Sequence, residues 1–259
     1  MKKLIFLTIF LALLGIFALY SFLNRNKHPG IAEELSISPT AISLPKKQSI
    51  VFDFKESPVR VSWAVANPQQ IGLYSNLKNK KDSQKIKQEK NCKALVNGGF
   101  YSKENTHLGL FVSNFQTISQ SIRSSLLNSF FWIDNDQKPV MSFDPPQSLP
   151  RLALQSGPML IQKGKPLNLS IINDQNDRRS AITVTKSGQV IFLVIYLDKE
   201  EFQGPFLKDL PEALSIFFDK AEIEAVDAIN LDGGNASAFL SEFESINEFS
   251  QIGSYFCVK

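Results

Sequence analysis

Ten short apolar runs, separated by turn residues, constrain the fold of this chain more than any other feature. The runs are rich in Val, Ile and Phe, and Gly, Pro, Asn and Asp lie between them. They span residues 49–54, 59–66, 94–96, 108–112, 130–133, 152–154, 159–161, 181–184, 190–197 and 226–231. Such runs between turn residues are typical of β-strands. The sequence therefore predicts a chain built mainly from strands.

Only two segments compete as helices. The first is 209–221, where Asp209 and Glu212 have capping-box spacing and the apolar residues form one stripe. The second is the lysine-rich segment 79–90. We therefore predict an α+β fold, with a large mixed twisted β-sheet core and a few flanking helices.

The N-terminal segment predicts a membrane anchor. Residues 4–23 carry no charge and follow Lys2 and Lys3. A helix of this length spans about 30 Å, which is the thickness of the bilayer core. No small-x-small site follows it, so an uncleaved anchor is favoured over a removed signal.

The domain boundaries follow from this segment. Residues 24–48 contain three prolines and one glycine, Pro29, Gly30, Pro39 and Pro45, without a sustained period, which indicates a linker. The predicted organisation is 1–23 anchor or signal, 24–48 linker and 49–259 functional domain. We expect a membrane-anchored protein whose soluble domain lies outside the cytoplasm, in the periplasm or the extracellular space.

Charge and cysteine content exclude several classes of protein. Without Lys2 and Lys3, 26 of the 28 basic side chains remain against 25 acidic ones. A nearly neutral domain is not typical of a nucleic-acid binder. Two cysteines are too few for a disulfide scaffold or a Cys-rich zinc site. Cys92 and Cys257 form either one disulfide or two buried free thiols, and the sequence leaves both open.

Three predicted strands end in the same way, with a polar residue followed by glycine. The three ends are Asn97-Gly98-Gly99, Gln155-Ser156-Gly157-Pro158 and Asp232-Gly233-Gly234. Glycine lets the backbone approach a ligand closely, and exposed N–H groups in such turns can bind anions. Each motif alone is also an ordinary hairpin turn. Three together favour a site.

These motifs occur with others in a recognisable order. The series is Asn97-Gly98-Gly99-Phe100-Tyr101, Leu108-Gly109-Leu110, Gln155-Ser156-Gly157-Pro158-Met159-Leu160, Arg178-Arg179-Ser180-Ala181 and Asn230-Leu231-Asp232-Gly233-Gly234. Over roughly residues 90–240 it resembles the phosphodiester glycosidase family. The resemblance implies a hydrolase that cleaves a sugar-1-phosphodiester. A domain outside the cytoplasm would meet such bonds in glycans of an envelope or exopolysaccharide, and no Gly-x-Gly-x-x-Gly or phosphate-loop motif marks a nucleotide cofactor, so we expect none. Asn235 departs from the Gly or Ser of many members, which leaves the exact substrate open.

The resemblance also implies a set of catalytic residues. Asp232 matches the Asp-Gly-Gly motif and is the catalytic carboxyl group. Arg179 matches the Arg-[Ser/Thr]-Ala position and would bind phosphate through its guanidinium fork. Asn97 would orient the sugar or the attacking water. A second carboxylate is left open, because Glu104 and Asp227 match no motif.

The remaining implied contacts bind substrate. They come from Gly98, Gly99, Gln155, Gly157, Arg178, Gly233, Gly234 and Ser237. Adjacent residues of a strand point to opposite faces, so only one of the two arginines should reach the site. We choose Arg179, and for Arg178 the alternative is a surface arginine.

Other reaction classes fit the sequence less well. A Ser-His-Asp hydrolase needs a histidine, and the chain has only His28, in the linker, and His107, which we expect in a solvent-facing loop. Histidine pairs for zinc are absent, so no metal site is predicted. A hard cation held by Asp232 and backbone oxygens stays open, because no diagnostic series of ligands marks one. The alternative function is a membrane-tethered domain that binds carbohydrate or phosphoglycan without turnover.

Overall fold

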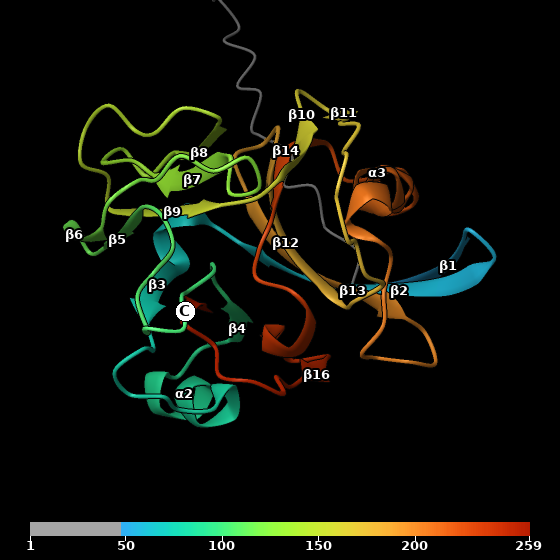
Figure 1. Cartoon of the computed structure of the whole chain (residues 1–259), viewed down its shortest axis with the longest axis horizontal. Helices are drawn as coiled ribbons and strands as arrows, with labels where there is room; N and C mark the ends of the chain where they lie inside the picture. Colours follow the sequence, from blue (N-terminus) through green and yellow to red (C-terminus); the bar gives the residue numbers. More distant parts are fainter. Residues whose placement is uncertain (1–47) are drawn as a thin grey trace, which may run out of the picture. The chain divides into compact units, whose positions relative to one another are not determined.

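A computed structural model describes residues 48–259. The predicted anchor at 1–23, and the predicted linker apart from Gln48, lie outside the described residues. Within the described part, no helix is long and apolar enough to cross a membrane. The domain is built mainly from strands, which form three sheets (Figure 1).

The largest sheet has seven strands, in the order β1-β2-β13-β12-β14-β10-β11. Their bounds are β1 Ser49–Phe54, β2 Ser57–Ala66, β13 Val190–Leu197, β12 Arg179–Thr185, β14 Ala225–Asn230, β10 Met159–Gln162 and β11 Lys165–Pro166. Helix α3, Leu210–Lys220, packs on one face of this sheet (Figure 1). Trp63 of β2 contacts Phe217 of α3 edge to face, with ring centroids 5.2 Å apart. The apolar stripe of α3 is therefore core packing.

Two five-stranded sheets complete the domain. One has the order β16-β15-β4-β17-β3, and the other has the order β6-β5-β9-β7-β8. The bounds of the first are β16 Ser245–Ile246, β15 Phe239–Leu240, β4 Ala94–Asn97, β17 Ser254–Val258 and β3 Ile71–Ser75. Those of the second are β6 Gln116–Ser119, β5 Phe111–Ser113, β9 Leu152–Ser156, β7 Ser129–Ile133 and β8 Pro139–Ser142. Helix α2, Ser83–Lys90, precedes β4, and 3₁₀ turns occur at Pro68–Gln70, Leu207–Asp209 and Gly234–Ala236.

The three sheets share one hydrophobic core. Phe256 of β17 lies at its centre, with its ring centroid 5.0 Å from that of Phe192 on β13 and 5.9 Å from that of Phe131 on β7. All three side chains are fully buried. Burial of apolar area is the main favourable term in folding, so this shared core fixes how the three sheets meet.

The α+β class is confirmed, but the arrangement of the sheets differs from the prediction. We expected one mixed sheet, whereas every strand pairing within residues 48–259 is antiparallel. A parallel pair needs a crossover of a dozen or more residues, usually a helix. The described chain has few helices, so it uses hairpins and curls into three sheets instead.

Both helices form where they were expected, but their caps differ from the prediction. Asp209 makes no cap hydrogen bond at α3, so the predicted capping box is wrong. Its carboxylate instead accepts a hydrogen bond from Lys55 Nζ at 2.6 Å. Helix α2 does have a side-chain cap, because Asp82 Oδ1 accepts a hydrogen bond from Lys85 N at 2.8 Å.

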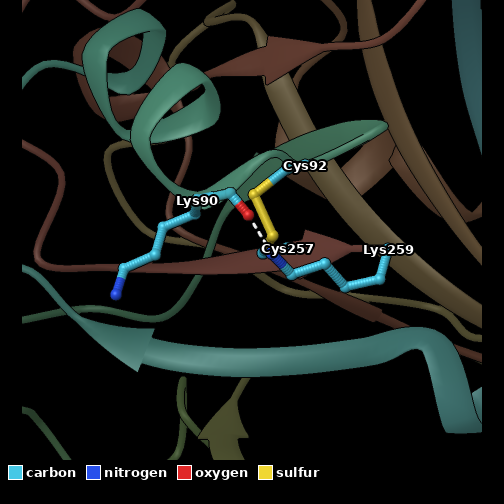
Figure 2. Close-up of a disulfide and its surroundings, with 4 residues drawn as sticks. All are labelled: Lys90, Cys92, Cys257 and Lys259. Atoms are coloured by element: carbon cyan, nitrogen blue, oxygen red, sulfur yellow. Dashed lines mark hydrogen bonds between the residues drawn. A yellow bond between two sulfur atoms is a disulfide. The ribbon is translucent and has the colours of Figure 1, made fainter.

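Cys92 and Cys257 form a disulfide, which confirms one of the two alternatives from the sequence (Figure 2). Their Cα atoms lie 5.3 Å apart, within the usual range for a disulfide. The bond joins the segment after α2 to β17, and Lys259 Nζ donates to the backbone carbonyl of Lys90 beside it (Figure 2). A disulfide fits a domain that lies in an oxidising compartment.

Reduction of this disulfide should destabilise the domain. The bond closes a loop between residues 165 positions apart in the sequence. For a loop of that length the expected loss is about 5 kcal/mol, or roughly 10–20 °C in Tm. Thermal unfolding with and without reductant measures this effect, with the Cys92→Ser, Cys257→Ser double variant as the control that no longer responds to reductant. An unchanged Tm in the reduced wild type would contradict the stabilising role.

Candidate active site

The three glycine motifs come from three different sheets, and their strand ends meet. Strand β4 leads to Gly98, β9 leads to Gly157 and β14 leads to Asp232. Asp232 N donates to the carbonyl of Gly98 at 3.1 Å, and Gly157 N donates to the carbonyl of Asn230 at 3.0 Å. We call this meeting point of the three strand ends the junction.

Asn97 holds the junction together from inside the protein. Its side chain is 1% exposed. Oδ1 accepts hydrogen bonds from Ser180 Oγ at 2.8 Å and from Ala238 N at 3.0 Å. Nδ2 donates to the carbonyls of Asp232 and Gly98. All of these hydrogen bonds thus go to protein groups around the Asp232 backbone.

Gln155 has a similar internal position. Its Oε1 accepts hydrogen bonds from Leu110 N at 3.1 Å and Ile122 N at 3.0 Å. Its Nε2 donates to the carbonyls of Ile122 at 2.8 Å and Leu127 at 2.7 Å. Three of these bonds hold the segment 121–128 over β9, and the fourth joins Leu110 to β9. That segment and Gln155 line an open cavity of about 940 Å³.

The glycines of the junction make room for neighbouring protein atoms. A Cβ on Gly98 would lie 2.4 Å from Ser254 Oγ, and one on Gly99 would lie 2.8 Å from Leu154 Cδ1. Gly157 has φ +150°, and its Cβ would lie 2.4 Å from the carbonyl oxygen of Leu126. A side chain at any of these positions would therefore force these neighbouring atoms to move.

Asp232 carries the one carboxyl group at the junction whose pKa is strongly shifted. Burial alone raises its pKa to about 7, and within residues 48–259 no hydrogen bond or ion pair to the carboxyl group opposes the shift. The side chain keeps partial exposure. Tyr101 lies near it, since burial and then the Asp232 charge raise the pKa of the phenol. The phenol donates to the carbonyl of Gln251 at 2.6 Å.

Arg179 lies directly beside the Asp232 turn. Its Cδ would be 3.8 Å from a Cβ on Gly233. Nε donates to the carbonyl of Pro205 at 3.1 Å, while Nη2 donates to the carbonyl of Gln175 and forms an ion pair with Asp174 at 3.2 Å. Burial lowers the pKa of the guanidinium. The Arg179 side chain thus lies against the turn that follows Asp232, while its guanidinium is bound by Pro205, Gln175 and Asp174.

Arg178 is 1% exposed, so the alternative of a surface arginine is wrong. Its Nη2 donates to the carbonyls of Ser237 and Asn247, each at 2.8 Å, and its Nη1 donates to the carbonyl of Glu201 at 3.3 Å. Both arginines thus bind loop carbonyls around the same turn. Ser237 itself is fully buried, with no hydrogen-bond partner for Oγ within residues 48–259.

A carboxylate that sequence reasoning missed, Asp177, lies close to the turn. Its Oδ2 is 3.6 Å from the position that a Cβ on Gly234 would occupy. No motif marks Asp177, so the sequence held no signal for it. Of the two residues left open, Glu104 is exposed in the loop after Tyr101. Asp227 lies nearer the other end of β14, where its Oδ1 accepts a hydrogen bond from Lys163 N at 2.9 Å.

His107 is buried, which corrects the expectation of a solvent-facing histidine. Its ring stacks on Phe111 with centroids 3.9 Å apart, and Nε2 lies 2.8 Å from Ser75 Oγ. Burial lowers its pKa to about 4, so the ring is neutral at neutral pH. Among the described residues, no group of three or more His, Cys, Asp or Glu is placed to hold a metal ion.

The model of the phosphodiester glycosidase family matches residues 90–257. This range contains every motif of the junction and more than half of the chain. The chain therefore belongs to the phosphodiester glycosidase family. Comparison with curated protein sequences finds no match.

Solved structures show the same fold. The catalytic domain of zebrafish N-acetylglucosamine-1-phosphodiester alpha-N-acetylglucosaminidase, auto-inhibited by its pro-peptide, is 16% identical with a TM-score of 0.59, over 81% of each chain. A hypothetical protein from Synechocystis is 14% identical with a TM-score of 0.55, over 82% of this chain and 61% of that one. An exported protein of Burkholderia pseudomallei is 11% identical with a TM-score of 0.50, over 78% of this chain and 74% of that one.

Replacing Asp232 with Asn should stabilise the domain above pH 7. The unfolded carboxyl group ionises at its ordinary pKa of 3.8, whereas the folded one ionises at about 7. The stability contributed by Asp232 is thus present below pH 3.8 and is lost as pH rises toward 7. Three pKa units correspond to on the order of 4 kcal/mol. The amide avoids this loss, so the variant should melt roughly 5–10 °C higher at pH 8.

Thermal melts of both proteins at pH 4.5 and pH 8 measure this difference. The gain should shrink at the lower pH, where the wild-type carboxyl group is mostly protonated in the folded state. Asp53→Asn is the matched control, because Asp53 is exposed on β1. An equal gain at both pH values would exclude a buried charge as the cause.

Proposed function

We propose that this domain hydrolyses the bond between the anomeric carbon of a sugar and a phosphodiester, with Asp232 as the general base. The observation that carries this proposal is the Asp232 carboxyl group, which lies at the junction with a pKa raised to about 7. Membership of the phosphodiester glycosidase family supports the reaction class. The name of the zebrafish enzyme supports an N-acetylglucosamine-1-phosphodiester as the first substrate to test.

The chemistry needs one base and a leaving group. Water attacks the anomeric carbon while the Asp232 carboxylate takes its proton. The bond between the anomeric carbon and the phosphate oxygen breaks, and its electron pair leaves with the phosphate monoester. A phosphate leaves readily as an anion, so the reaction places less demand on an acid. A base with a pKa near 7 suits the operating pH.

We assign binding of the substrate's phosphate to Arg179. Its Nε and Nη2 bind Pro205, Gln175 and Asp174, which fixes the direction of the guanidinium. Nη1 is not used in these bonds, and we assign it to a phosphate oxygen. Asn97 and Gln155 are assigned to positioning, because their amides already bind the backbone.

The surroundings of the protein suggest where the substrate lies. The disulfide fits an oxidising compartment, and residues 4–23 have the length of a membrane anchor. A domain held outside the cytoplasm would meet phosphodiester-linked glycans of the envelope or an exopolysaccharide. We propose these glycans as the natural substrates.

Hydrolysis of a defined diester tests the reaction and the role of Asp232. The full chain is incubated with the methyl phosphodiester of N-acetylglucosamine 1-phosphate, and the released reducing sugar is measured. We expect kcat/KM to rise about tenfold per pH unit below pH 7 and to level off above it. Asp232→Asn should lower kcat by about 10²–10⁴.

The control is Asp53→Asn, which should keep wild-type turnover because Asp53 lies exposed on β1. A rate that falls as pH rises through 7 would instead give Asp232 the role of an acid. Binding of the diester without release of sugar would favour the alternative of a carbohydrate-binding domain.

A further inference from the structure

Two exposed phenylalanines form a pair beside the Asp232 turn. Phe202 is 47% exposed and Phe249 is 67% exposed. Their rings meet edge to face, with centroids 4.4 Å apart and planes at 86°. Exposed aromatic side chains that cluster on a soluble domain mark binding surfaces more often than isolated ones do. We call these two residues the aromatic pair.

Backbone hydrogen bonds attach the aromatic pair to the turn. The carbonyl of Asn235, three residues after Asp232, accepts hydrogen bonds from Phe249 N at 2.8 Å and Ser250 N at 3.0 Å. On the other side, the carbonyl of Phe202 accepts a hydrogen bond from Arg178 N at 3.0 Å, and the carbonyl of Arg178 accepts one from Gly234 N at 2.7 Å. The backbones that carry both rings are thus fixed relative to the residues that follow Asp232.

The buried arginine at the turn also fixes the two loops that carry the rings. Arg178 donates to the carbonyl of Asn247, two residues before Phe249, and to the carbonyl of Glu201, the residue before Phe202. Its Cζ lies 5.7 Å from the centroid of the Phe202 ring, within cation–π range. Burying a guanidinium is costly, and here its bonds hold an exposed surface in one geometry.

The surface around the aromatic pair is polar. Four exposed residues with amide side chains lie on the segments joined to it by backbone hydrogen bonds or adjacent in sequence. They are Asn176, Gln203, Asn235 and Asn247, and Asn247 Oδ1 also accepts a hydrogen bond from Gln84 Nε2 at 3.1 Å. Asn176 Nδ2 donates to Gln203 Oε1 at 2.9 Å, which orients both amides next to Phe202. An alkyl chain would need a continuous apolar surface, whereas this one alternates rings with hydrogen-bonding groups.

A pyranose ring has the matching chemistry. It presents a face of C–H groups that packs on aromatic rings, and its edge carries hydroxyl groups that both donate and accept hydrogen bonds. Amides can satisfy such hydroxyls, because they also donate and accept. Rigid aromatic side chains supply contact area at low entropic cost.

We propose that Phe202 and Phe249 form a saccharide subsite, in which a pyranose of the substrate packs on the aromatic pair and bonds to the surrounding amides. The subsite rests on the proposed function, since it binds one sugar of the same phosphodiester. It lies on the Asn235 side of the turn. Arg178 acts as a positioning residue, because its guanidinium is buried beneath the loops.

Binding of two diesters tests the subsite separately from turnover. N-acetylglucosamine 1-phosphate is esterified with methanol in one probe and with glucose in the other. Calorimetry measures Kd in the Asp232→Asn background, with and without Phe249→Ala or Phe202→Ala. We expect each alanine to weaken binding by about three- to tenfold, in line with the loss of one aromatic contact. Phe249→Trp should keep the wild-type Kd.

Phe115→Ala is the matched control, because Phe115 is also 47% exposed but lies in the turn between β5 and β6. Weaker binding of both diesters would place N-acetylglucosamine on the aromatic pair, and weaker binding of the glucose diester alone would place the second sugar there. Unchanged Kd values for both probes in both alanine variants, or no binding of either probe before substitution, would overturn the proposal. If wild-type protein releases no sugar but Phe249→Ala still weakens binding, the subsite stands and the hydrolase assignment fails.

Arg178→Lys tests the positioning role. Lysine keeps the charge but cannot reach three carbonyls with a planar fork. We expect a weaker Kd for the same probe that responds to Phe249→Ala, with no further loss in the Arg178→Lys, Phe249→Ala double variant. An additive loss would contradict an effect through the aromatic pair.

Discussion

The buried amide of Asn97 is the interaction on which the junction depends. It lies at the end of β4 and accepts hydrogen bonds from Ser180 on β12 and from the backbone of Ala238, while donating to the carbonyl of Asp232. One side chain thus connects a five-stranded sheet to the seven-stranded one. A buried amide without hydrogen-bond partners lowers the stability of the fold. If one of these bonds were lost, a buried polar group would therefore be left without a partner. This requirement fixes the backbone that carries Asp232.

The same rigidity accounts for the unusual state of Asp232. Its backbone N–H and carbonyl are both bound, to Gly98 and Asn97, so the side chain is held where burial disfavours its charge. A free loop would turn the carboxyl group toward water and relieve that cost. Buried groups with strongly shifted pKa values are found more often at functional sites than elsewhere in proteins. In the proposed reaction, this raised pKa suits Asp232 to act as a base at neutral pH.

Local apolar patterns predicted most of the long strands. Strands β1 and β13, for example, coincide with the apolar runs at 49–54 and 190–197. The five-residue strand β17 was missed, although it pairs with β4 on one side and β3 on the other, because turn residues precede so short a run. The number of sheets depends on long-range packing around Phe256, which no local pattern records.

Side-chain roles were harder to predict than positions. Asn97 and Gln155 were expected to face a ligand, yet a polar residue followed by glycine marks a close approach of backbone whether the neighbour is ligand or protein. Asp177 and the aromatic pair lie in no motif, since only the folded loops bring them to the turn.

Titration of the Asp232 carboxyl carbon by ¹³C NMR, with Asp232→Asn used for assignment, tests most directly whether the junction holds a buried carboxyl group. We predict a pKa of about 7 for Asp232. A pKa near the ordinary 3.8 would contradict the claim that the junction buries this carboxyl group.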